Sequence, residues 1–367
     1  MINRKSISMI VLACSLILSG CARGDVEPSK TSIPKIIITT TTSTQPSETE
    51  DPNRSLHEKP DINPNGNVVI LMTGDVHCGM DKGFSYGGLY EIRYQMEVKG
   101  DTVLLVDSGD AIQGSPIGYY SRGEVMINLM NAMDYDVAIP GEYEFHYGME
   151  RFYELAQMAR FEYVCCNFVK DGKLVLKPYV IKEACGKKIA FVGVTTPKTI
   201  TMAPAESFQD ESGNYVYGFM QDDTGDTISK AVQNAVDKAR AEGAQYVVLV
   251  GHIGNDEKSA PWTYNTVVSK VKGIDVYLDG HSHDTKVEEV ICADGKKIQR
   301  IPAGTKLNCI GWVRIAKKDG KVTSGVYTWS DSNTLTAPEM LDFENPMTKK
   351  VDEVKRENAV KNPWSLN

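Results

Sequence analysis

The chain has 367 residues, with 40 Lys and Arg against 48 Asp and Glu, so its formal net charge at neutral pH is −8. A hydrophobic content of 41% is typical of a globular protein and excludes a chain that is disordered throughout. The acidic balance argues against a nucleic-acid polymer as partner, because that binding depends on Lys and Arg neutralising phosphates. The length fits about two domains, or one large α/β domain with accessory segments.

Residues 1–21 have the features of an export signal. Arg4 and Lys5 precede an apolar run from Ile7 to Leu18, which is too short to span a bilayer permanently. The run ends in Leu18-Ser19-Gly20-Cys21, which resembles the lipobox of bacterial lipoproteins, where cleavage precedes a Cys that becomes lipidated. We therefore expect a protein of the cell envelope, outside the cytoplasm and anchored to the membrane through Cys21. The alternative is an ordinary secretory peptide in which Cys21 is incidental.

The rest of the chain divides into three predicted parts. Residues 22–66 contain six of the 16 prolines and no aromatic residue, so they cannot bury enough apolar surface to offset the entropy of ordering. We predict a disordered tether there, followed by a folded domain over residues 67–340. In the C-terminal tail, residues 341–367, we expect one helix within the charged stretch Lys349–Val360.

The predicted domain alternates between strand-like and helical patterns. The helical patterns are apolar at i, i+3 and i+4, whereas the strand-like runs are short and rich in β-branched residues. Strands are predicted at Val68–Met72, Thr102–Val106, Val137–Ile139, Tyr163–Cys166, Lys188–Val194, Tyr246–Val250 and Asp275–Leu278. Helices are predicted at Gly88–Val98, Val125–Met133, Met149–Ala159 and Thr227–Glu242. This order indicates βαβ units, and the strand-like region from Val287 to Trp329 makes the sheets mixed.

Five of the strand-like runs are followed by loops rich in Asp, Glu, His and Gly. In open α/β sheets, ligands bind outside the carboxyl ends of the strands, so these loops could form one site. Of six histidines, only His57, in the predicted tether, lies outside these loops. The five loops are Thr73–His77, Asp107–Gly114, Pro140–Gly148, Gly251-His252 and Asp279–His283.

The combination of carboxylates with several histidines favours Zn, Mn, Fe or Ni over Ca or Mg. One carboxylate can bridge two ions, and two ions about 3.5–4 Å apart can activate a water and clamp a phosphoryl group. A pair of divalent ions held in this way could act on a small phosphorylated substrate. The alternative, that each His caps a strand or packs locally, fits a single His better than several placed in this way.

The order of these motifs resembles the calcineurin-like metallophosphoesterases, and most closely the bacterial 5′-nucleotidases and 2′,3′-cyclic phosphodiesterases. The resemblance covers about Val68 to Ile315 and rests on Asp75-Val76-His77, Gly109-Asp110, Gly251-His252 and Gly280-His281-Ser282-His283. It implies a four-layered α/β/β/α sandwich of mixed sheets. It also implies one ion held by Asp75, His77, Asp110 and His283, and a second held by Asp110, Glu142, His252 and His281, with Asp110 bridging.

The third motif departs from the family pattern. The family reads Gly-Asn-His-Glu-Phe-Asp, whereas this chain has Glu142, Tyr143 and His146 in place of the Asn, the His and the second acid. Glu142 can still bind a metal, but its charge should favour the metal and disfavour a phosphate dianion. Tyr143 has a reference pKa of about 10, against about 6.5 for His, and losing a general acid–base group costs about 10²–10⁴ in rate. His146 could partly take over that role, or it is a solvated or packed loop residue.

Two functional hypotheses follow. The first is a membrane-anchored dinuclear phosphoesterase that hydrolyses phosphomonoesters or diesters, nucleotides among them, with Tyr143 or His146 assisting the leaving group. The second is a pseudoenzyme, a metal-retaining surface domain that binds a nucleotide or a partner without turnover. The family's nucleobase-stacking aromatic pair belongs to a second, C-terminal domain that lies outside the resemblance, so nucleotide specificity does not follow from it. Trp262 and Trp312 are expected in the core rather than in a pocket, Cys78 is expected to be a spectator thiol, and no particular oligomeric state is predicted.

Overall fold

The computed structural model describes residues 54–329 and 344–361. The predicted signal peptide, its lipobox residue Cys21 and most of the predicted tether lie outside the described residues. Within the described ranges, every helix is too short or too polar to cross a bilayer.

The first of two large sheets has the strand order β15-β14-β1-β2-β3-β4. Strands β1 to β4 are parallel to one another, whereas β14 and β15 run antiparallel to their neighbours. The strands are β1 (Val68–Thr73), β2 (Thr102–Asp107), β3 (Val137–Ala138), β4 (Glu162–Tyr163), β14 (Cys309–Ile315) and β15 (Val322–Thr328). All six residues of β1 are buried, which explains why it reads as an unbroken apolar run.

The second sheet has the order β12-β13-β11-β10-β8-β7, with a parallel centre and an antiparallel strand at each edge. Its strands are β7 (Tyr179–Ala184), β8 (Lys187–Thr195), β10 (Tyr246–His252), β11 (Val276–Asp279), β12 (Glu288–Ile291) and β13 (Lys297–Pro302). A third, small sheet joins β5 (Val169–Lys170), β6 (Lys173–Leu174) and β9 (Tyr217–Gly218). The prediction of mixed sheets is therefore confirmed.

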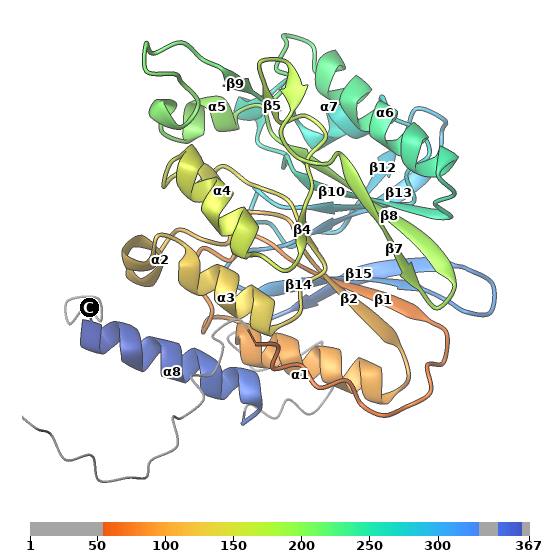
Figure 1. Cartoon of the computed structure of the whole chain (residues 1–367). Helices are drawn as coiled ribbons and strands as arrows, with labels where there is room; N and C mark the ends of the chain where they lie inside the picture. The colour runs from red at the N-terminus through yellow and green to blue at the C-terminus, as the bar shows by residue number, and fades with distance from the viewer. Residues whose placement is uncertain (1–53, 330–343, 362–367) are drawn as a thin grey trace, which may run out of the picture. The chain divides into compact units, whose positions relative to one another are not determined.

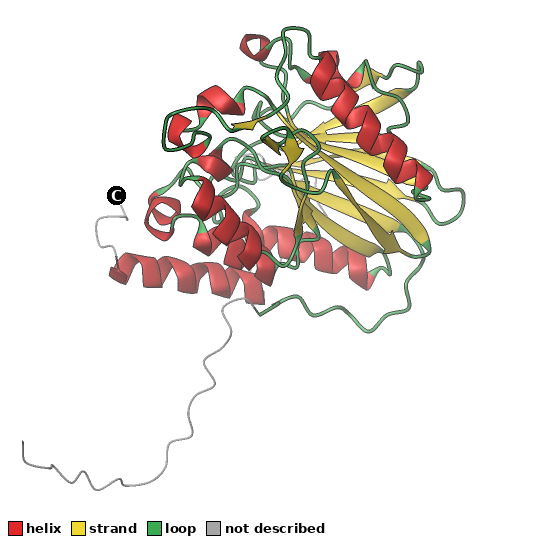
Figure 2. Ribbon diagram, turned by 45° about the horizontal axis from the view of Figure 1, so that its top comes forward, coloured by secondary structure: helices red, strands yellow, loops and turns green. Residues whose placement is uncertain are grey.

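The two large sheets pack face to face, and helices cover their outer faces (Figures 1 and 2). Ile70 and Val106 from one sheet and Phe191 and Val250 from the other belong to the core between the sheets. Helices α1 (Ser85–Val98), α3 (Glu124–Ala132) and α4 (Met149–Met158) cover the first sheet, and α6 (Asp226–Ala241) and α7 (Tyr264–Val268) cover the second. This is the four-layered α/β/β/α sandwich that the sequence predicts.

The longer predicted helices are all present, and shorter elements lie between them. The shorter helices are α2 (Pro116–Ser121) and α5 (Thr199–Met202), with 3₁₀ turns at Tyr143–Phe145, Ala205–Ser207 and Glu257–Ser259.

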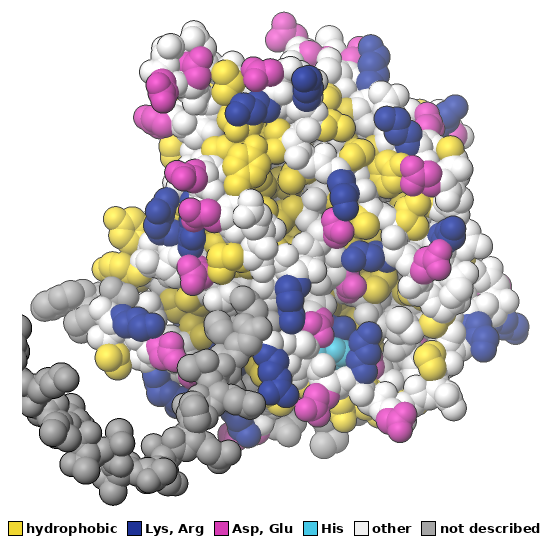
Figure 3. Space-filling view, in the orientation of Figure 1, with side chains coloured by type: hydrophobic (Ala, Val, Ile, Leu, Met, Phe, Trp, Pro, Cys, Tyr) yellow, Lys and Arg dark blue, Asp and Glu magenta, His cyan; other side chains and the backbone are white. Residues whose placement is uncertain are grey.

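On the face drawn in Figure 3, acidic and basic side chains are interspersed over the surface.

The packed part of the chain begins before residue 67, where we predicted the tether to end. The backbone N–H of Leu56 donates to the Ala132 carbonyl at 3.0 Å. The side chain of His57 is buried and lies 2.5 Å from a Glu97 carboxylate oxygen, whose other oxygen accepts from Arg93 Nε at 3.1 Å. A single buried polar contact leaves no apolar periodicity in the sequence, so the pattern of residues 54–66 does not reveal that Leu56 and His57 are packed.

Helix α8 (Pro346–Lys361) packs against α1 and includes the helix that was predicted over residues 349–360. Met347 and Val351 are its buried side chains. The approach of the two helices is close at Gly87, where a Cβ would lie 2.1 Å from the Thr348 hydroxyl oxygen. The C-terminal helix is thus part of the folded unit rather than a separate tail.

Replacing Glu97 with Gln should weaken the attachment of the N-terminal segment. Burial raises the pKa of Glu97, but the hydrogen bond from His57 and the charge of Arg93 outweigh that effect and hold the pKa below its usual value. Hydrogen bonds to charged groups are typically worth about 1.5–3 kcal/mol, so we expect the free energy of unfolding to fall by that amount at pH 7.

The pH dependence follows from the direction of this shift. A carboxylate whose pKa is lower in the folded than in the unfolded chain stabilises the folded protein. This stabilisation is complete at pH values above the pKa of the unfolded chain, about 4.3, and is lost as the pH falls through the pKa of the folded chain. Urea unfolding at pH 7 and pH 3 should therefore show a smaller difference between wild type and variant at pH 3. Glu154→Gln, which removes an exposed ion pair with Arg151, is the control and should have little effect at either pH. Equal losses at both pH values would contradict this account.

Candidate metal centre

Seven candidate ligands lie at one edge of the two sheets, just beyond the carboxyl ends of their parallel strands. The parallel registers of β1 with β2 and of β10 with β11 place these strand ends side by side. Three groups of potential ligands form, each with its ligand atoms within 4.8 Å of one another. They are Asp75 with His77 and His283, Glu142 with His252 and His281, and Asp75 with Asp110 and His252.

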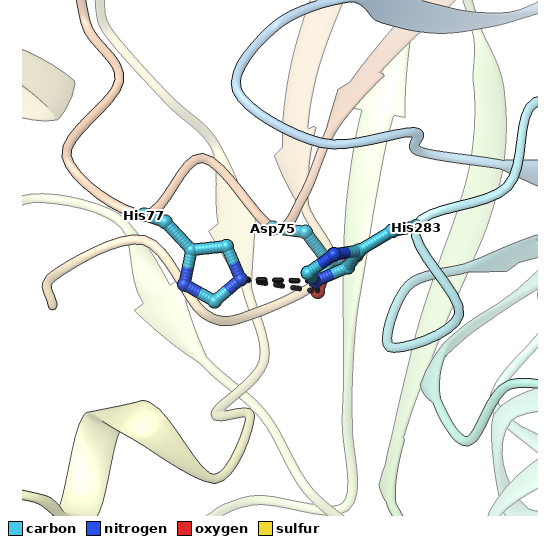
Figure 4. Close-up of side chains that lie close together, drawn as sticks. All are labelled: Asp75, His77 and His283. Atoms are coloured by element: carbon cyan, nitrogen blue, oxygen red, sulfur yellow. Dashed lines mark hydrogen bonds and ion pairs between the residues drawn. The ribbon is translucent and has the colours of Figure 1, made fainter. Parts of the chain in front are cut away.

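In the first group, shown in Figure 4, two imidazoles and a carboxylate point toward one another. His77 Nε2 and His283 Nε2 are 3.0 Å apart. Asp75 Oδ1 lies 3.4 Å from His283 Nε2 and 3.9 Å from His77 Nε2. The loops after β1 and β11, far apart in the sequence, thus supply one cluster of three donors.

The second group is more buried. Glu142 Oε2 lies 2.9 Å from His252 Nε2 and 3.2 Å from His281 Nδ1. His252 Nε2 is also 3.2 Å from Asp110 Oδ2 and 3.9 Å from Asp75 Oδ1, so it faces carboxylates from three different loops. Asp110 therefore lies between the two groups, as expected of a bridging carboxylate.

The backbone at this edge is unusual. Asp75, His77, Asp110, His281 and His283 all have positive φ, between 46° and 76°. Non-glycine residues rarely adopt this left-handed region, and such strain clusters at functional sites, where the surrounding structure enforces it. The tight loops keep the side chains at the rim of the sandwich, directly above the strand ends.

The hydrogen bonds of two histidines indicate which nitrogens face the centre. His252 Nδ1 lies 2.7 Å from the Ser108 carbonyl, and His77 Nδ1 lies 3.1 Å from the Gln113 carbonyl. Because a carbonyl only accepts, each Nδ1 carries the hydrogen and donates, which leaves the Nε2 lone pair for a ligand. Asp75 Oδ1 and His252 Nε2 are buried without a hydrogen-bond partner. This donor set fits divalent cations of the kind that bind nitrogen and oxygen together.

The electrostatics point the same way. Burial, together with the Glu142 carboxylate, raises the pKa of Asp110 well above its usual value. Burial also opposes ionisation of Glu142, but His252 and His281 outweigh it and hold the pKa of Glu142 well below normal. The pKa of His252 is lowered by burial and raised more strongly by Asp110 and Glu142, so the net shift is upward. The cluster thus attracts positive charge to the space between the carboxylates.

Tyr143 and His146 lie beside the first group. The Tyr143 ring meets His77 edge to face, with centroids 4.9 Å apart, and stacks on His146 at 4.3 Å. Burial, followed by Asp110 and Glu142, raises the pKa of Tyr143, so its hydroxyl stays protonated and can donate a hydrogen bond. Burial lowers the pKa of His146, and its Nε2 is buried without a hydrogen-bond partner, so this histidine is packed rather than solvated.

Sequence reasoning missed the residues that hold these loops in place. Glu144 accepts backbone hydrogen bonds from Gly141 at 2.7 Å, Asp110 at 2.8 Å and Ala111 at 2.9 Å. It thereby ties the loop that carries Asp110 to the loop that carries Glu142. Its position in the same loop as Glu142 was the one signal that could have indicated this role.

Close approach of the same loops requires glycine at residue 109. Gly109 has φ of +96°, and a Cβ there would lie 2.5 Å from the Gly141 nitrogen and 3.0 Å from His252 Nδ1. A larger residue would therefore separate the second, third and fourth ligand loops.

Two other expectations concern cysteine and tryptophan. The cysteines of the described residues are all free, and burial raises the pKa of the Cys78 thiol to about 12, so it remains a thiol. Trp312 packs against the core of the first sheet and stacks on Tyr327, and Trp262 packs against the core of the second.

The family comparison agrees with this geometry. The family model described as Calcineurin-like phosphoesterase matches residues 68–285. The chain belongs to this family. The matched span runs from β1 through His283 and so includes all seven donors.

Relatives of this chain include proteins named as nucleotidases. The chain is 30% identical over 246 residues to a 2′,3′-cyclic-nucleotide 2′-phosphodiesterase/3′-nucleotidase of Yersinia enterocolitica, over 58% of this chain and 36% of that protein. It is 26% identical to the snake venom 5′-nucleotidase of Crotalus adamanteus, over 59% of this chain and 37% of that protein. The chain thus spans less than two fifths of the length of these relatives.

A solved structure shares the fold. The 5′-nucleotidase precursor of Thermus thermophilus superposes with a TM-score of 0.62 at 18% identity, over 80% of this chain and 59% of that chain. At this identity the similarity concerns the fold alone.

Replacing Glu144 with Gln should loosen both loops of the centre. The amide offers one accepting oxygen in place of two, so at least one of the three backbone N–H groups loses its partner. We expect a loss of about 1–3 kcal/mol in the free energy of unfolding, the cost of an unsatisfied buried group, and less bound metal. Urea unfolding and elemental analysis test this, with the exposed Glu150→Gln as control. Wild-type stability and metal content in Glu144→Gln would show that these hydrogen bonds do not matter.

Proposed function

We propose that this chain is a dinuclear, metal-dependent phosphoesterase of the cell envelope that hydrolyses phosphomonoesters or phosphodiesters, including nucleotides. The observation that carries the proposal is the convergence of seven ligand side chains, with Asp75 Oδ1 and His252 Nε2 buried and without hydrogen-bond partners. Membership of the calcineurin-like phosphoesterase family supports it.

The two groups of donors match two ion positions. Asp75, His77 and His283 would hold one ion, and Glu142, His252 and His281 would hold the other, with Asp110 shared between them. When bound, such ions lower the pKa of a coordinated water and neutralise charge on a phosphoryl group.

The protein groups around the ions orient the ligands and the substrate. The Tyr143 N–H donates to Asp110 Oδ1 at 2.8 Å, which leaves Oδ2 directed at His252. The Tyr143 hydroxyl, protonated at neutral pH, can donate a hydrogen bond to a phosphoryl or leaving oxygen, but its raised pKa makes it a weak proton donor. His146, neutral and stacked on Tyr143, restricts the orientation of that ring.

Nucleotides are proposed as substrates because of the relatives. The Yersinia protein is named for cyclic nucleotides and 3′-nucleotides, and the Crotalus protein for 5′-nucleotides. The negative charge of Glu142 beside the second group should weaken binding of a phosphate dianion relative to a diester monoanion.

The altered third motif supports a second candidate, a pseudoenzyme that retains its ions and binds a nucleotide or a partner without turnover. Its basis is the chemistry of Tyr143, which cannot exchange protons near pH 7 as a histidine does. Both candidates require the same metal centre, so they differ in turnover and not in metal content.

Metal content and hydrolysis together separate the candidates. We expect about two divalent ions per purified chain by elemental analysis. His252→Ala removes a direct ligand and should lower the metal content. We expect the metal-loaded wild type to hydrolyse bis-p-nitrophenyl phosphate and nucleoside monophosphates.

The matched variant combines Glu142→Asn, Tyr143→His and His146→Asp, which restores the family motif. A faster rate in this variant over a measurable wild-type rate supports an enzyme of reduced activity. Activity found in the triple variant alone supports the pseudoenzyme, and a wild type that binds no ions would reject both.

The membrane anchor is also a proposal, which rests on the apolar run and Leu18-Ser19-Gly20-Cys21. Cys21→Ser should move the protein from the membrane fraction to the soluble extracytoplasmic fraction, because the thiol that accepts the lipid is lost. Fractionation and labelling with a radioactive fatty acid measure this. Cys78→Ser, a buried thiol in the folded domain, is the control and should stay in the membrane fraction.

A further inference from the structure

A buried arginine lies behind the two histidines of the loop that follows β11. Arg300 belongs to β13, pairs with Tyr277 of β11, and is 0% exposed. Burying a guanidinium group is costly unless carboxylates and hydrogen bonds compensate its charge. The position of its partners therefore shows what the arginine stabilises.

The partners of Arg300 flank the ligand loop on both sides. Its Nε donates to Asp279 Oδ2 at 2.8 Å, and its two terminal nitrogens donate to Asp284 Oδ1 at 3.1 Å and Oδ2 at 2.8 Å. Asp279 comes immediately before Gly280-His281, and Asp284 comes immediately after His283. The Arg300 guanidinium thus holds both ends of the segment 280–283. This segment supplies His283 to the first group of potential ligands and His281 to the second.

We call Arg300 with Asp279 and Asp284 the arginine clamp. Asp279 connects this clamp to a third histidine, His252. Its Oδ1 accepts from the Tyr277 hydroxyl at 2.6 Å and from the backbone nitrogens of Ile253 and Gly254, each at 3.2 Å. These two residues directly follow His252. Arg300, through Asp279, is therefore connected to the loops that carry His252, His281 and His283.

The orientation of the guanidinium plane is itself fixed. Arg300 lies over the Tyr264 ring, 4.6 Å from its centroid, and the Tyr264 hydroxyl donates to Glu288 at 2.7 Å. The planar fork of arginine suits bidentate binding of Asp284, which the single ammonium of lysine cannot reproduce.

The segment between Asp279 and Asp284 has a strained backbone. His281 and His283 have φ of +76° and +56°, a conformation that persists only where its surroundings enforce it. His281 N–H also donates to Asp75 Oδ2 at 2.9 Å, so the loop meets the first ligand loop as well.

We propose that Arg300 is a positioning residue of the metal centre, which sets the affinity of both ion positions by fixing the two ends of the His281–His283 loop and the backbone after His252. The inference rests on the proposed function, because it takes these histidines to be metal ligands. Arg300 acts on these histidines through Asp279 and Asp284, the carboxylates to which its nitrogens donate.

The test compares two Arg→Lys variants of the purified full chain. Arg300→Lys keeps the positive charge but loses the planar guanidinium that binds both oxygens of Asp284. Arg240→Lys is the matched control, because Arg240 binds Asp275 at 2.7 Å, at the opposite end of β11 from Asp279. Both substitutions weaken an arginine–aspartate pair at an end of β11. Only the pair of Arg300 lies next to the loop that carries His281 and His283.

The readouts are calorimetric titration of the metal-free protein with Mn²⁺, the absorption spectrum with Co²⁺, and thermal unfolding without metal. We expect Arg300→Lys to weaken Mn²⁺ binding at both positions about 10–100-fold, as is usual for residues that orient metal ligands, and to alter the Co²⁺ bands. Arg240→Lys should match the wild type in affinity and spectrum, even where its unfolding temperature falls.

Wild-type affinity and an unchanged Co²⁺ spectrum in Arg300→Lys would overturn the inference, as would equal losses in both variants. If Arg300→Lys does not fold, Asp284→Asn, which weakens one side of the clamp at a partly exposed carboxylate, should reduce Mn²⁺ affinity, and no reduction would overturn the inference. A wild type that binds no Mn²⁺ would instead reject the proposed metal centre itself.

Discussion

The site depends on the crowding of negative charge and imidazole lone pairs at one buried edge of the two sheets. Asp75, Asp110 and Glu142 are at most 3% exposed, yet their carboxylates converge. Like charges in a buried place are costly unless a positive charge lies between them. His252 and His77 donate their Nδ1 hydrogens to carbonyls, so their lone pairs face the same space. Divalent cations bound in this space would relieve this repulsion.

The fold produces this crowding in two steps. Packing of the two sheets against each other brings the carboxyl ends of β1, β2, β3, β10 and β11 to one edge. Buried acceptors then join the loops that leave these strands, with Glu144 linking the second and third loops and Asp279 linking the fourth and fifth. Arg300 fixes Asp279 in turn. The ligands are therefore held mainly by residues that do not face the centre.

The loop that follows β3 places two kinds of chemistry side by side. Glu142 in this loop reaches His252 and His281. The next residue, Tyr143, has a raised pKa, so its hydroxyl stays protonated at neutral pH. The loop thus combines a carboxylate that attracts cations with a hydroxyl that is a weak proton donor.

Apolar runs and 3.6-residue periodicity predicted the main strands and helices, and the polar loops at the strand ends predicted one site, because these are local signals. The four-layered sandwich and the choice of the seven candidate ligands followed from the family resemblance. Sequence reasoning missed the edge strand β7 and placed the start of the folded domain too late. The folded chain was needed to show that His57 lies against Glu97, 40 residues away, and that Arg300 clamps the loop of His281 and His283. A buried polar residue is specified by partners from distant elements, so its role appears only once the chain has folded.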